Sequence, residues 1–340
     1  MDKKDPIIDI VKGIAIILVV CGHVIQRSMF TWNQDYFLNP AFRVIYAFHM
    51  PLFVFVSGYL IAFSLNKRSP LEVFKTRCKS LLVPLVAWGI LGLITNYCLK
   101  IPLNSSIWFV WFLFTLFMSS FLLLCSVELE KRLGLVAFGL VYVCLLIIPY
   151  NDFCFLYYIK WFYLFYIAGY FVNRWKLAIS SKISRGVVFI ISLAAFVGLV
   201  GYWTTSDYIY INQMNFLSNN YLDEVLRIAY RYVLGFLGII LVFFVGKSFL
   251  NTKVSSWLGV VGFYSLDIYL IQRYIVEGIY PIFLSKTHVK FDSNSPVFIY
   301  VFVPLMAMFF IGLCVIISKL LIRKSSVLTK LLLGGRGSRC

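Results

Sequence analysis

The sequence predicts an all-α integral membrane protein with about ten transmembrane helices. Of its 340 residues, 61% are hydrophobic and only 13% carry a charge, whereas a soluble domain has about 25% charged residues. Several apolar runs reach the ~20 residues that a helix needs to cross a bilayer. Lysine and arginine concentrate in alternate connections between these runs, a pattern typical of membrane orientation. Together these observations favour a polytopic protein surrounded by membrane lipids.

Ten segments are apolar enough to be predicted as spans. The fifth and sixth are short, and Lys160 interrupts the sixth. The predicted spans are 6–27, 43–63, 79–99, 107–127, 133–150, 154–173, 186–203, 225–246, 257–280 and 297–322. The chain shows no fixed-period repeat and no low-complexity segment, so we expect a single polytopic membrane domain over residues 1–340. The first apolar run lacks an Ala-x-Ala cleavage site and is expected to be a retained span.

The connections alternate in charge. Those that follow odd-numbered spans are poorer in basic residues and carry Asp35, Asp152, Asp207 and Asp223. The positive-inside rule therefore predicts that both termini are cytoplasmic. The net charge of +17 comes from basic residues concentrated in alternate loops, so it does not indicate nucleic-acid binding. The basic residues that precede the first span or follow even-numbered spans are Lys3, Lys4, Lys67, Arg68, Lys75, Arg77, Lys79, Lys131, Arg132, Arg174, Lys176, Lys182, Arg185, Lys247, Lys253, Arg323, Lys324, Lys330, Arg336 and Arg339.

The eight cysteines are scattered, mostly within apolar segments. No CxxC pair and no Cys/His spacing typical of a metal site occurs. Buried cysteine commonly acts as a small hydrophobic residue. We therefore expect neither a disulfide framework nor a bound metal.

The first predicted span carries Asp9, Lys12 and His23 on one face. At about 100° per residue, Lys12 and His23 point within ~20° of each other, and Asp9 falls within ~40° of His23. Lys12 and His23 are ~16 Å apart along the helix axis. Ionisable groups inside a membrane are costly and usually functional. A structural role for the first two is also open, because Lys12 can snorkel to the interface and Asp9 can pair with it.

A second set of polar residues is predicted in the outer half of the membrane. His49 in the second span can share a depth with His23. Arg227 and Arg231 lie one turn apart, and two like charges so placed can hold an anionic acceptor such as a lipid pyrophosphate or an acidic glycan. Asp267, nearer the middle of the ninth span, can pair with one of the cations of this set or orient His23. The remaining members of this set are Arg27, Arg43, Arg273 and Glu277, of which Glu277 can simply neutralise Arg273.

These residues resemble the motifs of membrane acyltransferase family 3. Lys12, ten further residues and His23 resemble its basic-x10-His signature. Other stretches similar to the family are His49-Met-Pro-Leu-Phe with Ser57-Gly58-Tyr59, Arg77 and Lys79 before Leu81-Leu82-Val83-Pro84, Trp111-Phe112-Leu113, Gly169-Tyr170, and Gly262 to Leu270. The family often continues the last stretch with a histidine where this chain has Gln272. The order and spacing of the motifs, over nearly the whole length, carry the resemblance.

The resemblance implies a bacterial enzyme of the plasma (inner) membrane, in its membrane-only form. Family members are best known as O-acetyltransferases that act on surface polysaccharides. For this chain it implies transfer of an acyl group, expected to be acetyl, from cytoplasmic acyl-CoA to a hydroxyl of a cell-envelope, exported or lipid-linked glycan. Acetyl-CoA would be a co-substrate, and no permanently bound cofactor is expected.

His23 is the predicted catalytic residue. A histidine suits removal of the proton from a sugar hydroxyl, and it can equally accept the acyl group as a nucleophile; both routes are open. Lys12, Arg77 and Lys79 are predicted to bind the donor's phosphates, while plain membrane anchoring also explains Arg77 and Lys79. The predicted acceptor-binding or orienting residues are His49, Asp9, Asp267, Arg227, Arg231 and Arg273. The alternative function is a transporter or flippase that moves a lipid-linked glycan.

Overall fold

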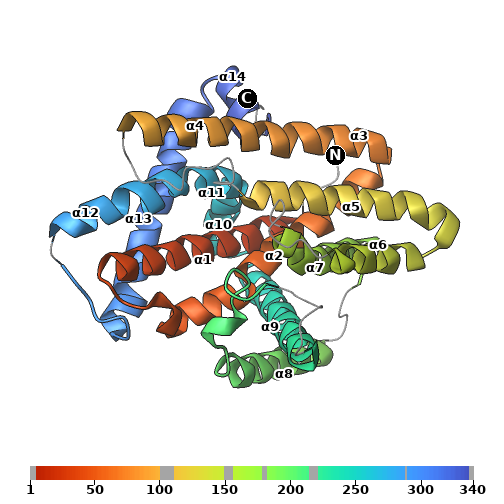
Figure 1. Ribbon diagram of the computed structural model, residues 1–340, viewed down its shortest axis with the longest axis horizontal. Helices are drawn as coiled ribbons and strands as arrows, with labels where there is room; N and C mark the ends of the chain where they lie inside the picture. Colours follow the sequence, from red (N-terminus) through yellow and green to blue (C-terminus); the bar gives the residue numbers. More distant parts are fainter. Residues whose placement is uncertain are drawn as a thin grey trace. The chain divides into compact units, whose positions relative to one another are not determined.

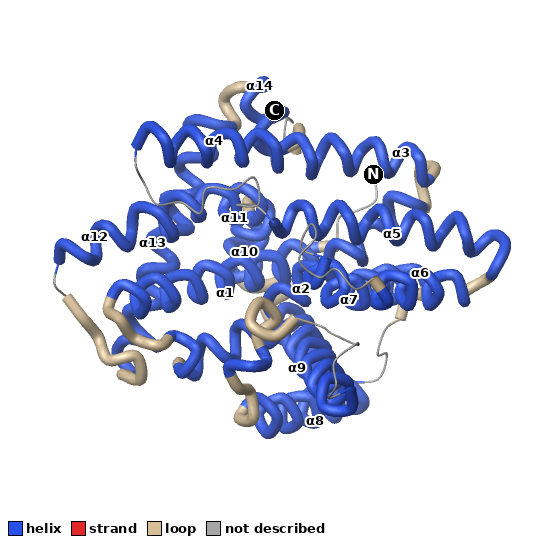
Figure 2. Tube along the Cα trace, in the orientation of Figure 1, coloured by secondary structure: helices blue, strands red, loops and turns tan. Residues whose placement is uncertain are grey.

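The structure, a computed structural model, describes residues 5–99, 111–148, 156–177, 182–213, 221–287 and 289–336. These ranges contain helices, turns and loops but no strand, so the fold class is all-α as predicted (Figures 1 and 2). In chain order the α-helices are α1 (Pro6–Thr31), α2 (Pro40–Leu65), α3 (Pro70–Arg77), α4 (Val83–Leu99), α5 (Trp111–Leu133), α6 (Val136–Ile147), α7 (Leu156–Arg174), α8 (Lys182–Val200), α9 (Tyr221–Ser248), α10 (Lys253–Phe263), α11 (Ser265–Tyr274), α12 (Tyr280–Thr287), α13 (Val303–Ile317) and α14 (Ser326–Leu333).

Six of the described helices are long and apolar enough to cross a membrane. They are α1, α2, α5, α9 and the continuous helices Pro70–Cys98 and Phe298–Ile322. A seventh span results if α10 and the helix Ser265–Thr287, which meet at a bend of 62°, are counted as one. Large apolar side chains such as Leu305 and Phe309 of α13 are more than half exposed, which suits a lipid environment and not water. The chain is a multi-pass membrane protein.

Each of the ten predicted spans coincides with a helix or a helix pair. The fifth, sixth and seventh correspond to α6, α7 and α8, which are not among the six membrane-length helices. Parts of three predicted spans, at 107–110, 149–150 and 154–155, lie outside the described residues, as do both chain ends at 1–4 and 337–340. The count of ten, the single domain and the cytoplasmic position of both termini stay predictions.

Most helix ends differ from the predicted spans by a few residues, and two of the differences have a clear local cause. The third helix begins at Pro70 instead of residue 79, because Ser69 caps it and exchanges hydrogen bonds with Glu72 in a capping box. The ninth span was predicted to be continuous, but Tyr264 ends α10 with φ −86° and ψ 7° and precedes α11 at the 62° bend. The capping box is readable as Ser69-Pro-Leu-Glu72 but lies in a polar stretch before the predicted span, whereas the bend lies inside an apolar run that continues through it.

Three prolines explain three widened turns in these helices. Pro84, Pro281 and Pro304 each follow a π-helical turn by two residues. The turns are Cys78–Leu82, Ile275–Ile279 and Phe298–Phe302. A proline has no N–H to donate and its ring clashes with the carbonyl four residues earlier, so a wider turn relieves the conflict. For Pro281 that carbonyl belongs to Glu277, which places this carboxylate in a widened turn.

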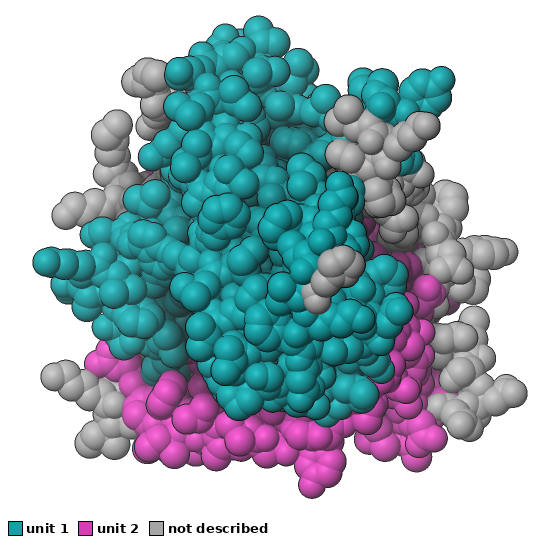
Figure 3. Space-filling model, turned by 90° about the vertical axis from the view of Figure 1, so that its left-hand side faces the viewer, with its two compact units in different colours: residues 1–50, 83–110, 242–340 teal, residues 51–82, 111–241 magenta. Residues whose placement is uncertain are grey.

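The chain forms two units, coloured teal and magenta in Figure 3. The first unit comprises residues 1–50, 83–110 and 242–340. In it, α1 contacts α10, α11, α12 and α13. Glycines allow the closest approach: a Cβ at Gly13 would overlap the carbonyl of Leu258, and one at Gly262 would overlap the carbonyl of Asp9. Small residues at a helix crossing let two backbones pack directly, and this contact fixes α10 against the start of α1.

The second unit comprises residues 51–82 and 111–241. Glycines again allow two helices to pack closely: Gly58 of α2 lies against the carbonyl of Tyr166, and Gly169 of α7 lies against the carbonyl of Phe55. Hydrogen bonds between α5 and α7 add to this packing; Ser120 meets the hydroxyl of Tyr166 at 2.8 Å. The resulting interior is aromatic and largely closed.

Candidate active site

A carboxylate in the widened turn Ile275–Ile279 organises the polar centre of the first unit. The side chain of Glu277 is only 4% exposed. Its Oε2 accepts a hydrogen bond from Nη2 of Arg27 at 2.8 Å, and its Oε1 accepts one from Nη1 of Arg273, four residues earlier. Nδ1 of His23 lies 3.5 Å from the same Oε1. We call these four residues the Glu277 cluster.

Helix geometry explains how α1 supplies its part of the Glu277 cluster. His23 and Arg27 are four residues apart, so they lie on one face one turn from each other. A hydrogen bond of 2.7 Å between the hydroxyls of Ser28 and Tyr280 then joins this end of α1 to the start of α12. Because Tyr280 directly follows the widened turn, the bond positions the turn against α1.

The Glu277 cluster carries an excess of positive charge. One carboxylate faces two guanidinium groups, so the cluster is positive even with a neutral imidazole. Nε of Arg27 and Nδ1 of His23 are buried and make no hydrogen bond to other described residues. A distance of 3.5 Å exceeds the ordinary hydrogen-bond range, which leaves His23 near its carboxylate but not bonded to it. The cluster can therefore accept a further negative charge.

The ring of Tyr46 connects His49 with Gly22, the residue that precedes His23. Gly22 packs against Tyr46, whose ring edge would lie 2.8 Å from a Cβ at that glycine. The ring of Tyr46 in turn meets the ring of His49 at 4.6 Å between centroids. Nδ1 of His49 is 2.8 Å from the carbonyl of Ile45, and a carbonyl only accepts, so Nδ1 carries the proton. Nε2 of His49 is left as an acceptor.

The other predicted site residues lie apart from the Glu277 cluster. Asp9 and Lys12 form an ion pair near the start of α1, the pairing that the sequence left open. Asp267 does not orient His23, because Arg323 binds both of its oxygens, at 2.8 and 3.1 Å, and the hydroxyl of Ser318 donates to it as well. Its cation partner is Arg323, which is not one of the outer cations that the sequence suggested for it.

Four predicted site residues belong to the second unit. Arg77 is half-buried at the end of α3, and Lys79 is exposed in the turn that follows. Arg231 is fully buried and donates to the carbonyls of Asn212 and Ser206. Arg227 is half-buried one turn earlier on α9. The guanidinium of Arg231 is thus used to hold the connection that precedes α9.

Two members of the Glu277 cluster were not predicted as site residues. The sequence reading assigned Glu277 only the neutralisation of Arg273, a contact that the structure confirms, and it placed Arg27 among general outer cations. The signal available for Arg27 was its spacing of one turn from His23. Nothing in the sequence joins Arg27 to Glu277, which is 250 residues away. Within the described residues, no group of three or more His, Cys, Asp or Glu side chains is arranged to hold a metal ion.

Comparisons with known proteins define the class. The family model described as "Acyltransferase domain" matches residues 5–323 of the chain. The chain belongs to this acyltransferase family, in agreement with the resemblance to membrane acyltransferase family 3. It is therefore an acyltransferase by class, built from membrane helices.

Two curated relatives carry the name nodulation protein NolL. The protein from Mesorhizobium japonicum is 27% identical over 235 residues, which cover 62% of this chain and 60% of the relative. The protein from Sinorhizobium fredii is 40% identical over 87 residues, 26% of this chain and 24% of the relative. The matched part thus spans less than two-thirds of either relative's length. No solved structure matches the chain.

Proposed function

We propose that this acyltransferase is an O-acetyltransferase of the bacterial inner membrane. It transfers the acetyl group of cytoplasmic acetyl-CoA to a hydroxyl of an exported or lipid-linked glycan. The observation that carries the proposal is the Glu277 cluster: a histidine held beside a buried carboxylate and two arginines, on the membrane helices of an acyltransferase-family chain. Ionisable groups in such a place are costly and mark function.

The Glu277 cluster supports transfer with His23 as general base. Nε2 of His23 takes the proton of the acceptor hydroxyl as its oxygen attacks the thioester carbonyl. The carbon–sulfur bond breaks, and the thiolate leaves with the proton that the imidazolium returns. Glu277, 3.5 Å from Nδ1, stabilises the imidazolium. The excess positive charge of Arg27 and Arg273 favours the negative charge that develops on the carbonyl oxygen.

A covalent route uses the same residues. Nε2 of His23 attacks the thioester, the thiolate leaves, and the acyl-imidazole then passes its acyl group to the acceptor hydroxyl. We assign the binding or deprotonation of that hydroxyl to His49, whose Nε2 is an acceptor and whose ring contacts Tyr46, a neighbour of Gly22. Both routes need His23 and differ in whether an acyl-enzyme forms.

Further residues take proposed binding roles. Lys12, Arg77 and Lys79 bind the donor from the predicted cytoplasmic side, with Asp9 holding Lys12 in place. On the acceptor side the proposal rests on His49, Arg227 and Arg273, since an anionic glycan or lipid pyrophosphate needs cations. Asp267 accepts hydrogen bonds from Arg323 and Ser318, and the two terminal nitrogens of Arg231 donate to backbone carbonyls, which favours a positioning role for both.

The proposal is tested with purified full-length protein in lipid nanodiscs. Radiolabelled acetyl-CoA is supplied with a glycan extract, and both thioester cleavage and label in the glycan are measured. We expect cleavage that depends on the extract and label that mild base removes, as an ester requires. A flippase for a lipid-linked glycan would cleave no thioester, so flipping without cleavage would overturn the proposal. Mass spectrometry of envelope glycans with and without the gene then identifies the acceptor.

A further inference from the structure

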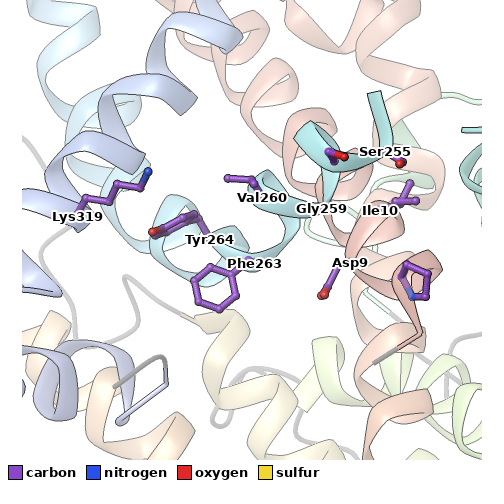
Figure 4. A pocket seen from close by; sticks show the side chains of 10 residues that line it. Asp9, Ile10, Ser255, Gly259, Val260, Phe263, Tyr264 and Lys319 are labelled. Atoms are coloured by element: carbon purple, nitrogen blue, oxygen red, sulfur yellow. The ribbon is translucent and has the colours of Figure 1, made fainter. Parts of the chain in front are cut away.

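A groove of about 530 Å³ opens at the start of α1, away from the Glu277 cluster (Figure 4). All of its lining belongs to the first unit. The part of the lining used below comes from α1, from α10 with the bend that follows it, and from the turn after α13; it consists of Asp9, Ser255, Ser256, Gly259, Tyr264 and Lys319. Its size lies in the range of small-molecule sites, about 300–1,000 Å³.

Lys319 gives this groove its charge. Asp9 at the other end is neutralised by Lys12, and the nearby Arg323 is neutralised by Asp267. Nζ of Lys319 lies 5.7 Å from the centre of the Tyr264 ring, and no carboxylate of the described residues forms an ion pair with it. One uncompensated cation therefore faces a groove that Ser256 also lines, whereas the hydroxyl of Ser255 already donates to the carbonyl of Thr252. This combination suits a phosphate group.

The rest of the wall is apolar and aromatic, so a phosphate alone would leave it uncovered. Pro6, Ile10, Val260 and Phe263 complete the lining. Arg323 lies 4.7 Å from the centre of the Tyr264 ring, which holds that ring in place. A ligand that combines phosphates with a flat ring and a thin chain matches this lining.

The position of the groove relates it to the reaction. Ile10 lines the groove and precedes His23 by thirteen residues on the same helix, so the two are about 20 Å apart along the axis at 1.5 Å per residue. That separation is comparable with the reach of an extended pantetheine arm. A thioester donor anchored here by its phosphates can deliver its acyl group to His23 along α1.

We propose that this groove binds the nucleotide end of the acyl-CoA donor, with a phosphate on Lys319 and the base against Tyr264. The inference rests on the proposed function, because the proposed donor, a coenzyme A thioester, combines these parts. It assigns the donor's anchor to α10 and the turn after α13, in the unit that carries His23.

Binding of unacylated coenzyme A to the full-length protein in nanodiscs tests the inference without any catalytic step. Lys319→Glu should weaken binding about 10-fold to 100-fold, since it removes one charge-assisted contact and adds repulsion. Gly259→Leu should weaken it comparably by filling the groove. Nothing lies within 4 Å of a Cβ at Gly259, so this variant leaves packing intact and tests the groove even if the charge reversal disturbs folding.

Matched controls separate the groove from general effects. Lys324→Glu reverses a nearby exposed charge outside the lining, and Gly312→Leu adds a side chain at another open helical glycine. Both should bind coenzyme A as the wild type does. Wild-type affinity in both Lys319→Glu and Gly259→Leu would overturn the inference, and loss in Lys79→Glu would then leave the phosphates with the proposed residues at the α3 end. A wild-type protein that binds no coenzyme A would instead refute the proposed donor itself.

A lipid headgroup is the other source of phosphate. Nanodiscs made of phosphatidylcholine alone and with phosphatidylglycerol distinguish the two sources, with ADP as a soluble competitor. We expect ADP to displace coenzyme A in both membranes and Lys319→Glu to abolish this competition. Displacement by phosphatidylglycerol but not by ADP would overturn the inference and make the groove a lipid site.

Discussion

Two buried carboxylates, ten residues apart on the segment from α11 to α12, have opposite surroundings. Asp267 meets one cation: Arg323 binds both of its oxygens, and the hydroxyl of Ser318 donates as well. Glu277 meets two arginines and a histidine. The first group is neutral and its acceptors are filled. The second is positive and retains a buried donor, Nε of Arg27, without a hydrogen-bond partner among the described residues.

This difference distinguishes an ion pair that stabilises the fold from a cluster that can take part in catalysis. A buried ion pair that is neutral and fully hydrogen-bonded has nothing left to offer a substrate, and breaking it is costly. A cluster with surplus charge is incompletely satisfied until a ligand or a developing negative charge completes it. We therefore expect changes around Asp267 to affect stability and changes around Glu277 to affect turnover.

The largest effect is expected at His23. His23→Gln keeps a polar side chain of similar bulk but cannot act as a base near neutral pH, so transfer of label to the glycan should fall by about 10²–10⁴-fold. Thermal unfolding in detergent and binding of coenzyme A should stay at the wild-type level. His49→Ala is the matched control and should retain measurable turnover with a raised requirement for acceptor. Near-wild-type transfer by His23→Gln would move the search for the base to His49.

The next largest effect is expected at the neutral pair. Arg323→Gln leaves Asp267 as a buried charge without its cation, and removal of one partner of such a pair costs roughly 3–5 kcal/mol. We expect a marked fall in the midpoint of thermal unfolding, while the protein that stays folded keeps its turnover per molecule at saturating acetyl-CoA. A stable variant with lost turnover would reverse the roles of the two carboxylates.

The contrast between these sites also shows how far sequence reasoning reaches. The helices were predictable because the length of each apolar run can be read directly from the sequence. The shared face of Lys12 and His23 follows from helical periodicity. The contact between Arg27 and Glu277 spans 250 residues, and that between Arg323 and Asp267 spans 56, so no local pattern reveals either. For Asp267 the sequence suggested one of the outer cations or His23, whereas packing pairs it with Arg323. The bend at Tyr264 was missed because the apolar run continues through it.

A smaller effect is expected at Ser318, which is buried and donates its hydroxyl to Asp267. Ser318→Ala removes that donor while both bonds from Arg323 remain. The cost should be about 1–3 kcal/mol of unfolding free energy, below that of Arg323→Gln, with turnover unchanged. Chemical denaturation in mixed micelles compares the two variants. Equal losses would mean that the hydroxyl, and not the guanidinium, is the main partner of Asp267.

The smallest change in stability is expected at Arg27. Its side chain is 30% exposed, and Arg273 still neutralises Glu277 when it is removed, so Arg27→Gln should cost about 1 kcal/mol or less. Turnover should nevertheless fall about tenfold, because the cluster loses its surplus charge and with it ~1.4 kcal/mol of stabilisation of the developing oxyanion. Arg27→Lys should recover part of the rate, since a lysine keeps the charge without the fork of donors. Initial rates and thermal midpoints are measured on the same preparations, with Arg323→Gln alongside. A large loss of stability at unchanged turnover in Arg27→Gln would make the Glu277 cluster a second structural ion pair.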